Sequence, residues 1–142
     1  MFRVTRRYSF AASHRLHAPQ LSEEQNRRLY GKCNNPYGHG HNYVVEVTLE
    51  GRPDPVTGMV LDLKELKEIL NREVVTPYDH RFLNYEVAPF DRVVPTTENI
   101  ARDIWERLKP HVCGPGHHLR AVRVYETPDL YVDYFGEQPC SA

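Results

Sequence analysis

The chain contains 142 residues, of which 40% are hydrophobic and 26% are charged, as in an ordinary globular protein with one hydrophobic core. Its 18 basic and 19 acidic residues give a formal net charge of −1, so no overall field favours nucleic acid or an anionic membrane as a partner. The first residues, MFRVTRRYSF, lack the apolar core of a signal peptide, and no apolar run approaches the roughly 20 residues of a transmembrane helix. We therefore expect a cytoplasmic protein with a single domain over residues 1–142.

The first third of the chain predicts two strands. Phe2–Phe10 alternates apolar and basic side chains, as in a half-buried strand. Ser9–Leu29 loses that alternation and predicts a loop that could contain a short helical turn. His41–Leu49 (HNYVVEVTL) alternates again and predicts the second strand. The turn residues of Gly51–Gly58 precede an extended apolar run at Met59–Leu63, so we expect a hairpin there.

Two helices are predicted next. Apolar residues recur at three- and four-residue steps on one face of the first helix, namely Leu63, Leu66, Leu70 and Val74. Pro77 should end this helix. The second helix should begin at Thr96 or Thr97 and end at Pro110. Its buried stripe consists of Ile100, Ile104 and Leu108.

The last two predicted strands are Leu119–Glu126 and Leu130–Phe135, which alternate and are joined by a turn. The element order is therefore ββααββ. Strands in neighbouring pairs with helices between them predict an antiparallel α+β domain whose two helices pack on one face of the sheet. Four strands leave exposed sheet edges, so we expect assembly through those edges.

Three histidines could bind a metal ion together. His39 and His41 flank Gly40 at the start of the second strand, and side chains two residues apart on a strand point to the same face. His14 follows the first strand and would lie beside them if the two strands pair. Three neutral imidazoles without a fourth protein ligand are typical of a catalytic zinc site, and the alternative is that HGH is only a polar turn. Four further histidines lie in predicted loops and are expected to be solvated: His17, His111, His117 and His118.

Cys33 is the cysteine with a possible chemical role. It lies six residues before His39 in a polar loop beside Lys32, and neighbouring cations favour the thiolate. The thiolate could be a fourth metal ligand or could act as a base outside the ligand set, and the spacing alone does not separate these roles. Cys113 is expected to be a small buried apolar side chain, and Cys140 to be exposed.

Asp79 and His80 form a second candidate group, in the sequence TPYDHRFLN. An aspartate beside a histidine is often only a loop pair. If the pair faces the site, the carboxylate could orient an imidazole that carries protons in general acid–base catalysis.

Two further segments could bind a polar ligand. Thr96, Thr97 and Glu98 cap the second helix, and their hydroxyls and backbone N–H groups could also contact a ligand. Glu126 ends a buried strand, where a carboxylate could accept two hydrogen bonds from a guanidine-like pair of N–H groups. The alternative for Glu126 is an ion pair with an arginine at the rim of the sheet.

Five motifs occur in this order: FAASHRL, CNNPYGHGHNY, YDHRFLN, PTTENIA and VYET. Together they resemble the 6-pyruvoyl-tetrahydropterin synthase family from about Ser9 to Glu137. The resemblance implies the tunnelling fold, in which subunits join their sheets into a barrel and two trimers stack head to head as a homohexamer. It also implies one zinc ion per subunit, bound by His14, His39 and His41.

The resemblance further implies a role for each remaining candidate. Cys33 would be the catalytic base rather than a metal ligand. Asp79 and His80 would complete the proton transfer from across a subunit boundary. Glu126 would hold the 2-amino-4-oxo edge of the pterin. The other polar groups of the pterin would be held by Thr96, Thr97 and Glu98.

The implied reaction converts 7,8-dihydroneopterin triphosphate into 6-pyruvoyl-tetrahydropterin with loss of triphosphate and no external redox cofactor. A requirement for activating magnesium stays open. The first alternative is 6-carboxytetrahydropterin synthase of the queuosine pathway. This chain resembles that family less closely, because its members have three residues between the cysteine and HGH. This chain has five, Asn34 to Gly38, which favours the pyruvoyl synthase. The second alternative is a zinc-binding scaffold without catalysis, which has no need of a cysteine, an Asp–His pair and Glu126 together.

Overall fold

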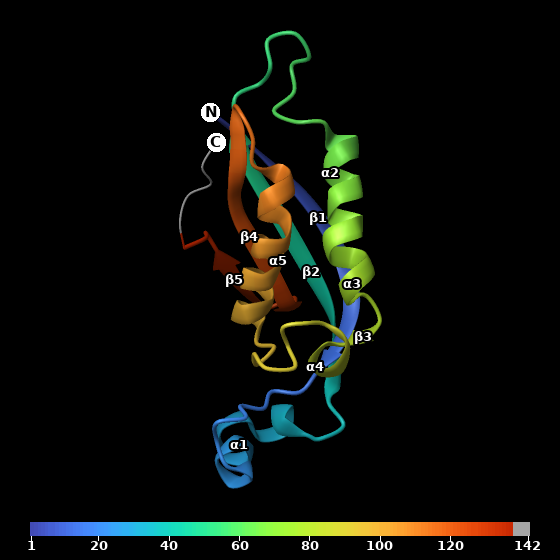
Figure 1. Ribbon diagram of the computed structural model, residues 1–142, viewed down its shortest axis with the longest axis vertical. Helices are drawn as coiled ribbons and strands as arrows, with labels where there is room; N and C mark the ends of the chain where they lie inside the picture. The colour runs from blue at the N-terminus through green and yellow to red at the C-terminus, as the bar shows by residue number, and fades with distance from the viewer. Residues whose placement is uncertain (138–142) are drawn as a thin grey trace.

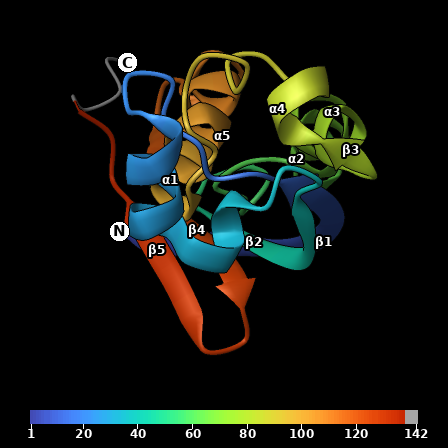
Figure 2. The same cartoon turned by 90° about the horizontal axis from the view of Figure 1, so that it is seen from below.

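The computed structural model describes residues 1–137, which form a five-stranded sheet with helices α2 (Leu63–Leu70) and α5 (Thr97–Val112) on one face (Figure 1, Figure 2). The strands are β1 (Phe2–His14), β2 (His39–Gly51), β3 (Arg81–Phe82), β4 (His117–Thr127) and β5 (Leu130–Tyr134). Their order in the sheet is β3-β1-β2-β4-β5, and all neighbours are antiparallel except β3, which runs parallel to β1. The predicted α+β fold is confirmed, with β3 as an additional strand. Cys140 lies outside the described residues.

The helices are α1 (Glu23–Tyr30), α2 (Leu63–Leu70), α3 (Thr76–Tyr78), α4 (Leu83–Glu86) and α5 (Thr97–Val112), with a 3-10 turn at Gly31–Asn34 and a π-turn at Asn71–Val75. The first predicted helix is present as α2, the π-helical turn and α3, so the chain stays helical to Tyr78 and Pro77 does not end it. Proline is tolerated there because it lies in the first turn of α3. The second predicted helix is present as α5. Within residues 1–137, none of these helices is long and apolar enough to cross a membrane.

The prediction of a loop over Ser9–Leu29 was wrong at the start of that segment, and the short helical turn allowed within it is present as the eight-residue helix α1. Strand β1 continues to His14 because Ala11 to Ser13 pair with residues 40–42 of β2, although these small side chains give no apolar alternation. Helix α1 begins after Ser22, whose hydroxyl accepts a hydrogen bond from the Gln25 amide while the Gln25 side chain accepts one from the Ser22 amide. This reciprocal pair is a capping box.

Two other local predictions were also wrong. Residues 59–62 form no strand, and the carboxylate of Asp62 instead accepts a hydrogen bond from the Lys64 amide at the start of α2. Pro110 lies inside α5, which ends only at Val112. A proline in the last turn removes one backbone donor, but its φ angle is helical, so the chain can remain helical for two more residues.

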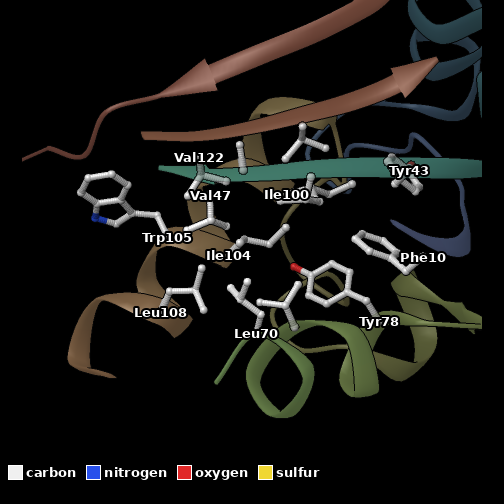
Figure 3. Packing of buried hydrophobic residues seen from close by; sticks show 14 of the residues in the cluster. Phe10, Tyr43, Val47, Leu70, Tyr78, Ile100, Ile104, Trp105, Leu108 and Val122 are labelled. Carbon is white, nitrogen blue, oxygen red and sulfur yellow. The ribbon is translucent and has the colours of Figure 1, made fainter. Parts of the chain in front are cut away.

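The core lies between the sheet and helices α2 and α5 (Figure 3). The inward side chains of β2, which are Tyr43, Val45, Val47 and Leu49, are fully buried. Helix α5 contributes the predicted stripe of Ile100, Ile104 and Leu108, together with Trp105. This packing fixes the start of α5 and the last residues of β1 relative to β2, which positions the site described below.

We expect Ile104→Ala to lower the free energy of unfolding by about 2–5 kcal/mol, because it opens a cavity around a fully buried side chain. Urea denaturation followed by circular dichroism measures this change. Leu63→Ala on α2 is the matched control, since Leu63 is 47% exposed and its loss should change stability by roughly 0.5 kcal/mol or less. Equal effects of the two substitutions would contradict this description of the core.

Candidate metal centre and active site

Three histidines meet where β1 ends and β2 begins. His14 pairs directly with His39, and His41 lies opposite Ala12, so all three side chains lie on the helix-facing side of the sheet. The Nε2 atoms of His14 and His39 are 3.1 Å apart. His14 is fully buried, while the other two are partly exposed. The predicted proximity of these imidazoles is therefore confirmed.

Glu126 completes this cluster from β4. The candidate ligand atoms of His14, His39, His41 and Glu126 all lie within 4.8 Å of one another. The register of β4 with β5 shifts between Tyr125 and Thr127, so Glu126 lies at a bulge, a feature that often redirects a side chain near a functional site. The structure thus brings together the predicted metal ligands and a residue predicted for substrate binding.

Contacts outside the cluster orient its groups. His14 Nδ1–H donates a hydrogen bond to the carbonyl of Pro95 at 2.8 Å, which leaves the Nε2 lone pair pointing into the cluster. The Tyr43 hydroxyl lies 3.3 Å from the same Nδ1. Thr97 donates from its hydroxyl to Glu126 Oε2 at 2.5 Å. Sequence reasoning missed the roles of Tyr43 and Pro95, because contacts to His14 across 29 and 81 residues leave no local pattern.

The cluster has the properties of a metal site. Burial lowers the pKa of His14 and of His41, which favours the neutral imidazole that binds metals. His39 Nδ1 and His41 Nε2 are buried without a well-directed hydrogen bond, although the latter lies 2.9 Å from Glu126 Oε1. The lone pairs of His14 Nε2 and His39 Nε2, and those of His41 Nε2 and Glu126 Oε1, face one another at short distance. Such lone pairs repel unless a proton or a cation lies between them. The donor set therefore fits a divalent metal ion such as zinc.

Cys33 lies on the 3-10 turn Gly31–Asn34, which we call the cysteine turn, six residues before His39 in the sequence. It is a half-buried free thiol, and it does not belong to the group of four close ligand atoms found among residues 1–137. Its backbone carbonyl accepts a hydrogen bond from the Leu16 amide at 2.9 Å. The cysteine turn is thereby attached to the chain two residues after His14.

Asp79 and His80 lie on the other edge of β1. Asp79 Oδ1 accepts a hydrogen bond from the Ala11 amide, and its Oδ2 lies 3.0 Å from His80 Nδ1. These contacts, with the backbone bond first, lower the pKa of Asp79. His80 has a φ of 61°, donates its amide to the Ala11 carbonyl, and exposes 82% of its side chain. The pair is formed as predicted, but its imidazole points to solvent and lies outside the metal cluster.

The predicted ligand-binding segment is the start of α5. The Thr96 hydroxyl caps the helix by accepting from the Asn99 amide at 3.2 Å. Thr97 is buried and bonds to Glu126, whereas Glu98 is exposed on the first turn. Only Thr97 of these three contacts the cluster directly in this chain.

Comparison with known proteins agrees with this geometry. The family profile described as 6-pyruvoyl tetrahydropterin synthase matches residues 3–137. The human 6-pyruvoyl tetrahydrobiopterin synthase is 50% identical over 134 residues, which cover 94% of this chain and 91% of the human one. The solved structure of Caenorhabditis elegans 6-pyruvoyl tetrahydropterin synthase is 43% identical, with a TM-score of 0.91 over 96% of each chain. An Archaeoglobus fulgidus protein, provisionally named 6-carboxy-5,6,7,8-tetrahydropterin synthase, is 39% identical over 95 residues, or 67% of this chain and 73% of its own. The chain belongs to the 6-pyruvoyl tetrahydropterin synthase family.

Proposed function

We propose that this protein is a zinc-dependent lyase that converts 7,8-dihydroneopterin triphosphate into 6-pyruvoyl-tetrahydropterin and triphosphate. The observation that carries the proposal is the cluster of three histidines and Glu126 in a chain that is 50% identical to a named 6-pyruvoyl synthase over almost its full length. His14, His39 and His41 would hold the zinc ion, and residues 1–142 would act as one synthase domain. A requirement for magnesium would be separate from the zinc site, and measuring activity with and without added magnesium would test it.

Zinc bound by the three histidines supplies a Lewis acid, which increases the acidity of substrate groups close to it. The Cys33 thiolate removes a carbon-bound proton as the general base. His80 Nδ1–H is held by the Asp79 carboxylate, so its Nε2 can return protons during the internal rearrangement. No external oxidant is needed, because the carbons of the substrate side chain are oxidised while the pterin ring is reduced.

The exposed position of His80 supports a role in a neighbouring subunit. Its imidazole is 82% exposed in the single chain and does not belong to the metal cluster, whereas a proton-transfer group must lie within hydrogen-bond reach of the reacting atoms. Among residues 1–137 the sheet ends at β3 and β5, each of which pairs with a strand on one side, and such edges are suited to joining copies of the sheet. We therefore propose a homohexamer made from two trimers, with each site completed across a subunit boundary.

Glu126 is proposed to recognise the 2-amino-4-oxo edge of the pterin through its carboxylate, which Thr97 orients. Thr96 and Glu98 would contact other polar groups of the ring. We expect Glu126→Gln to raise KM about tenfold to a hundredfold, because a hydrogen bond to a charged group contributes about 1.5–3 kcal/mol. Steady-state kinetics measure KM, and Glu50→Gln at the far end of β2 is the control.

The same variant separates substrate binding from metal binding. Zinc content measured by mass spectrometry should be unchanged in Glu126→Gln if the histidines hold the ion without the carboxylate. Loss of zinc together with an unchanged KM would instead assign Glu126 to the metal and contradict its role as the pterin anchor.

A metal-dependence experiment tests the proposed function against a zinc-binding scaffold. The purified protein is incubated with 7,8-dihydroneopterin triphosphate, and released triphosphate is followed before chelation, after chelation and after zinc is restored. We expect release that stops on chelation and returns with stoichiometric zinc. A protein that binds zinc but releases no triphosphate under any of these conditions would support the scaffold.

The carboxy synthase is the second candidate function, because the Archaeoglobus relative of that name is 39% identical over two thirds of this chain. Both reactions would begin from the same substrate at the same metal. They differ in whether the carbon side chain is retained or cleaved, so only the identity of the products separates them.

A further inference from the structure

The segment between β1 and α1 is held by asparagine side chains rather than by regular secondary structure. Asn84 Oδ1 accepts from the Arg15 amide at 2.8 Å, and Asn84 Nδ2 donates to the Arg15 carbonyl at 2.9 Å. Asn34 Nδ2 donates to the Leu16 carbonyl at 2.7 Å. A side-chain amide offers the same donor and acceptor as a peptide group. These two residues therefore replace the backbone partners that a further strand would have given this segment.

Asn34 is the contact that involves the cysteine turn. It is the residue after Cys33, and it is only 4% exposed. Both backbone groups of Leu16 are used, since its amide donates to the Cys33 carbonyl at 2.9 Å and its carbonyl accepts from Asn34 Nδ2. Arg15 Nε donates to the Asn34 carbonyl at 2.9 Å. Three hydrogen bonds thus connect residues 33–34 to the two residues that follow His14.

Asn84 fixes the opposite side of the same segment. It lies on α4, which directly follows the short strand β3. Because Asn84 holds both backbone groups of Arg15, that residue is attached to α4 through its backbone and to the cysteine turn through its side chain. Movement of the cysteine turn away from the end of β1 would break its three bonds to Arg15 and Leu16. Movement of Arg15 together with the turn would break the two bonds to Asn84.

We propose that Asn34 is a positioning residue that holds Cys33 at a fixed place relative to the metal-binding histidines, with Asn84 supporting the same segment from α4. The inference rests on the proposed function for the catalytic role of Cys33, but not for the fixed position of the cysteine turn. General-base catalysis needs the base at a defined distance from its proton, and a small displacement lowers the rate strongly. Asn34 acts through this placement and does not contact the substrate.

The substitution Asn34→Asp tests the proposal with almost no change of volume. A carboxylate cannot donate to the Leu16 carbonyl, so the contact is lost and the two oxygens repel. Asn35→Asp is the matched control, because Asn35 is exposed, lies next in the chain, and its side chain only accepts from the Tyr37 amide. The control adds the same charge at nearly the same place and keeps its acceptor.

Two readouts are measured on the zinc-loaded protein. The first is the pH profile of iodoacetamide alkylation at Cys33, followed by peptide mass spectrometry, and the second is the pair kcat and KM. We expect Asn34→Asp to alter the alkylation profile and to lower kcat about tenfold to a hundredfold, while KM and zinc content stay close to those of the unmodified protein. Asn35→Asp should leave both readouts unchanged.

Asn34→Ser provides a second variant if the buried carboxylate prevents folding. Serine is uncharged and too short to reach the Leu16 carbonyl, so the same two effects are expected. Alkylation and kcat close to those of the unmodified protein in either folded variant would overturn the inference. If the alkylation profile changes but the unmodified protein makes no pterin product, the positioning role stands and the proposed function fails.

Discussion

Replacing Cys33 by alanine should lower turnover by about 10²–10⁴-fold, because that is the usual contribution of a positioned proton-transfer group. Zinc content and KM should change little, since Cys33 lies outside the group of close metal-ligand atoms. The measurement is steady-state kinetics with the zinc-loaded protein, combined with metal analysis of the same sample.

The control for this substitution is Asn35→Ala in the same loop, at an exposed residue whose side chain makes one local contact. It should retain turnover, which would show that disturbance of the loop is not the cause. Turnover of Cys33→Ala equal to that of the unmodified protein would remove the cysteine from the mechanism. Loss of zinc in Cys33→Ala would instead make the cysteine a metal ligand.

Replacing His41 by asparagine should abolish zinc binding and lower turnover by at least about a thousandfold, because a catalytic metal contributes several kcal/mol of transition-state stabilisation. The substitution is suited to the test because the His41 side chain is 18% exposed, so less packing is lost than with fully buried His14. Metal content after dialysis and kcat are the measured quantities.

His111→Asn is the matched control for a histidine away from the cluster. His111 is 38% exposed, lies in the last turn of α5 and pairs with Glu73. This variant should keep full zinc content and turnover. If His41→Asn also retained one zinc ion per chain, the metal site would have to lie elsewhere, and the assignment of the three histidines would be wrong.

The histidine cluster could be predicted because it depends on local rules. His39 and His41 share a face through the period of two residues on a strand, and the pairing of β1 with β2 followed from their alternation. The exact end of β1 could not be predicted, since Ala11, Ala12 and Ser13 are too small to show an apolar pattern. That part of the strand is defined by pairing with β2, which only the tertiary structure reveals.

The rest of the site depends on contacts between distant residues. The Pro95 carbonyl reaches His14 across 81 residues, and Asn84 reaches Arg15 across 69. Strand β3 has only two residues and pairs through its backbone, so its side chains give no signal. Glu126 could be named as a candidate because it is a carboxylate at the end of a buried strand, but the bulge that brings it to the histidines became evident only from the register of β4 with β5.

Identification of the product is the most direct test of the proposed reaction. The zinc-loaded protein is incubated with 7,8-dihydroneopterin triphosphate, and the pterin and any released carbon fragment are identified by mass spectrometry. We predict 6-pyruvoyl-tetrahydropterin, which retains all carbons of the side chain, together with triphosphate. Formation of 6-carboxytetrahydropterin with release of acetaldehyde would contradict the proposal and identify the chain as the carboxy synthase.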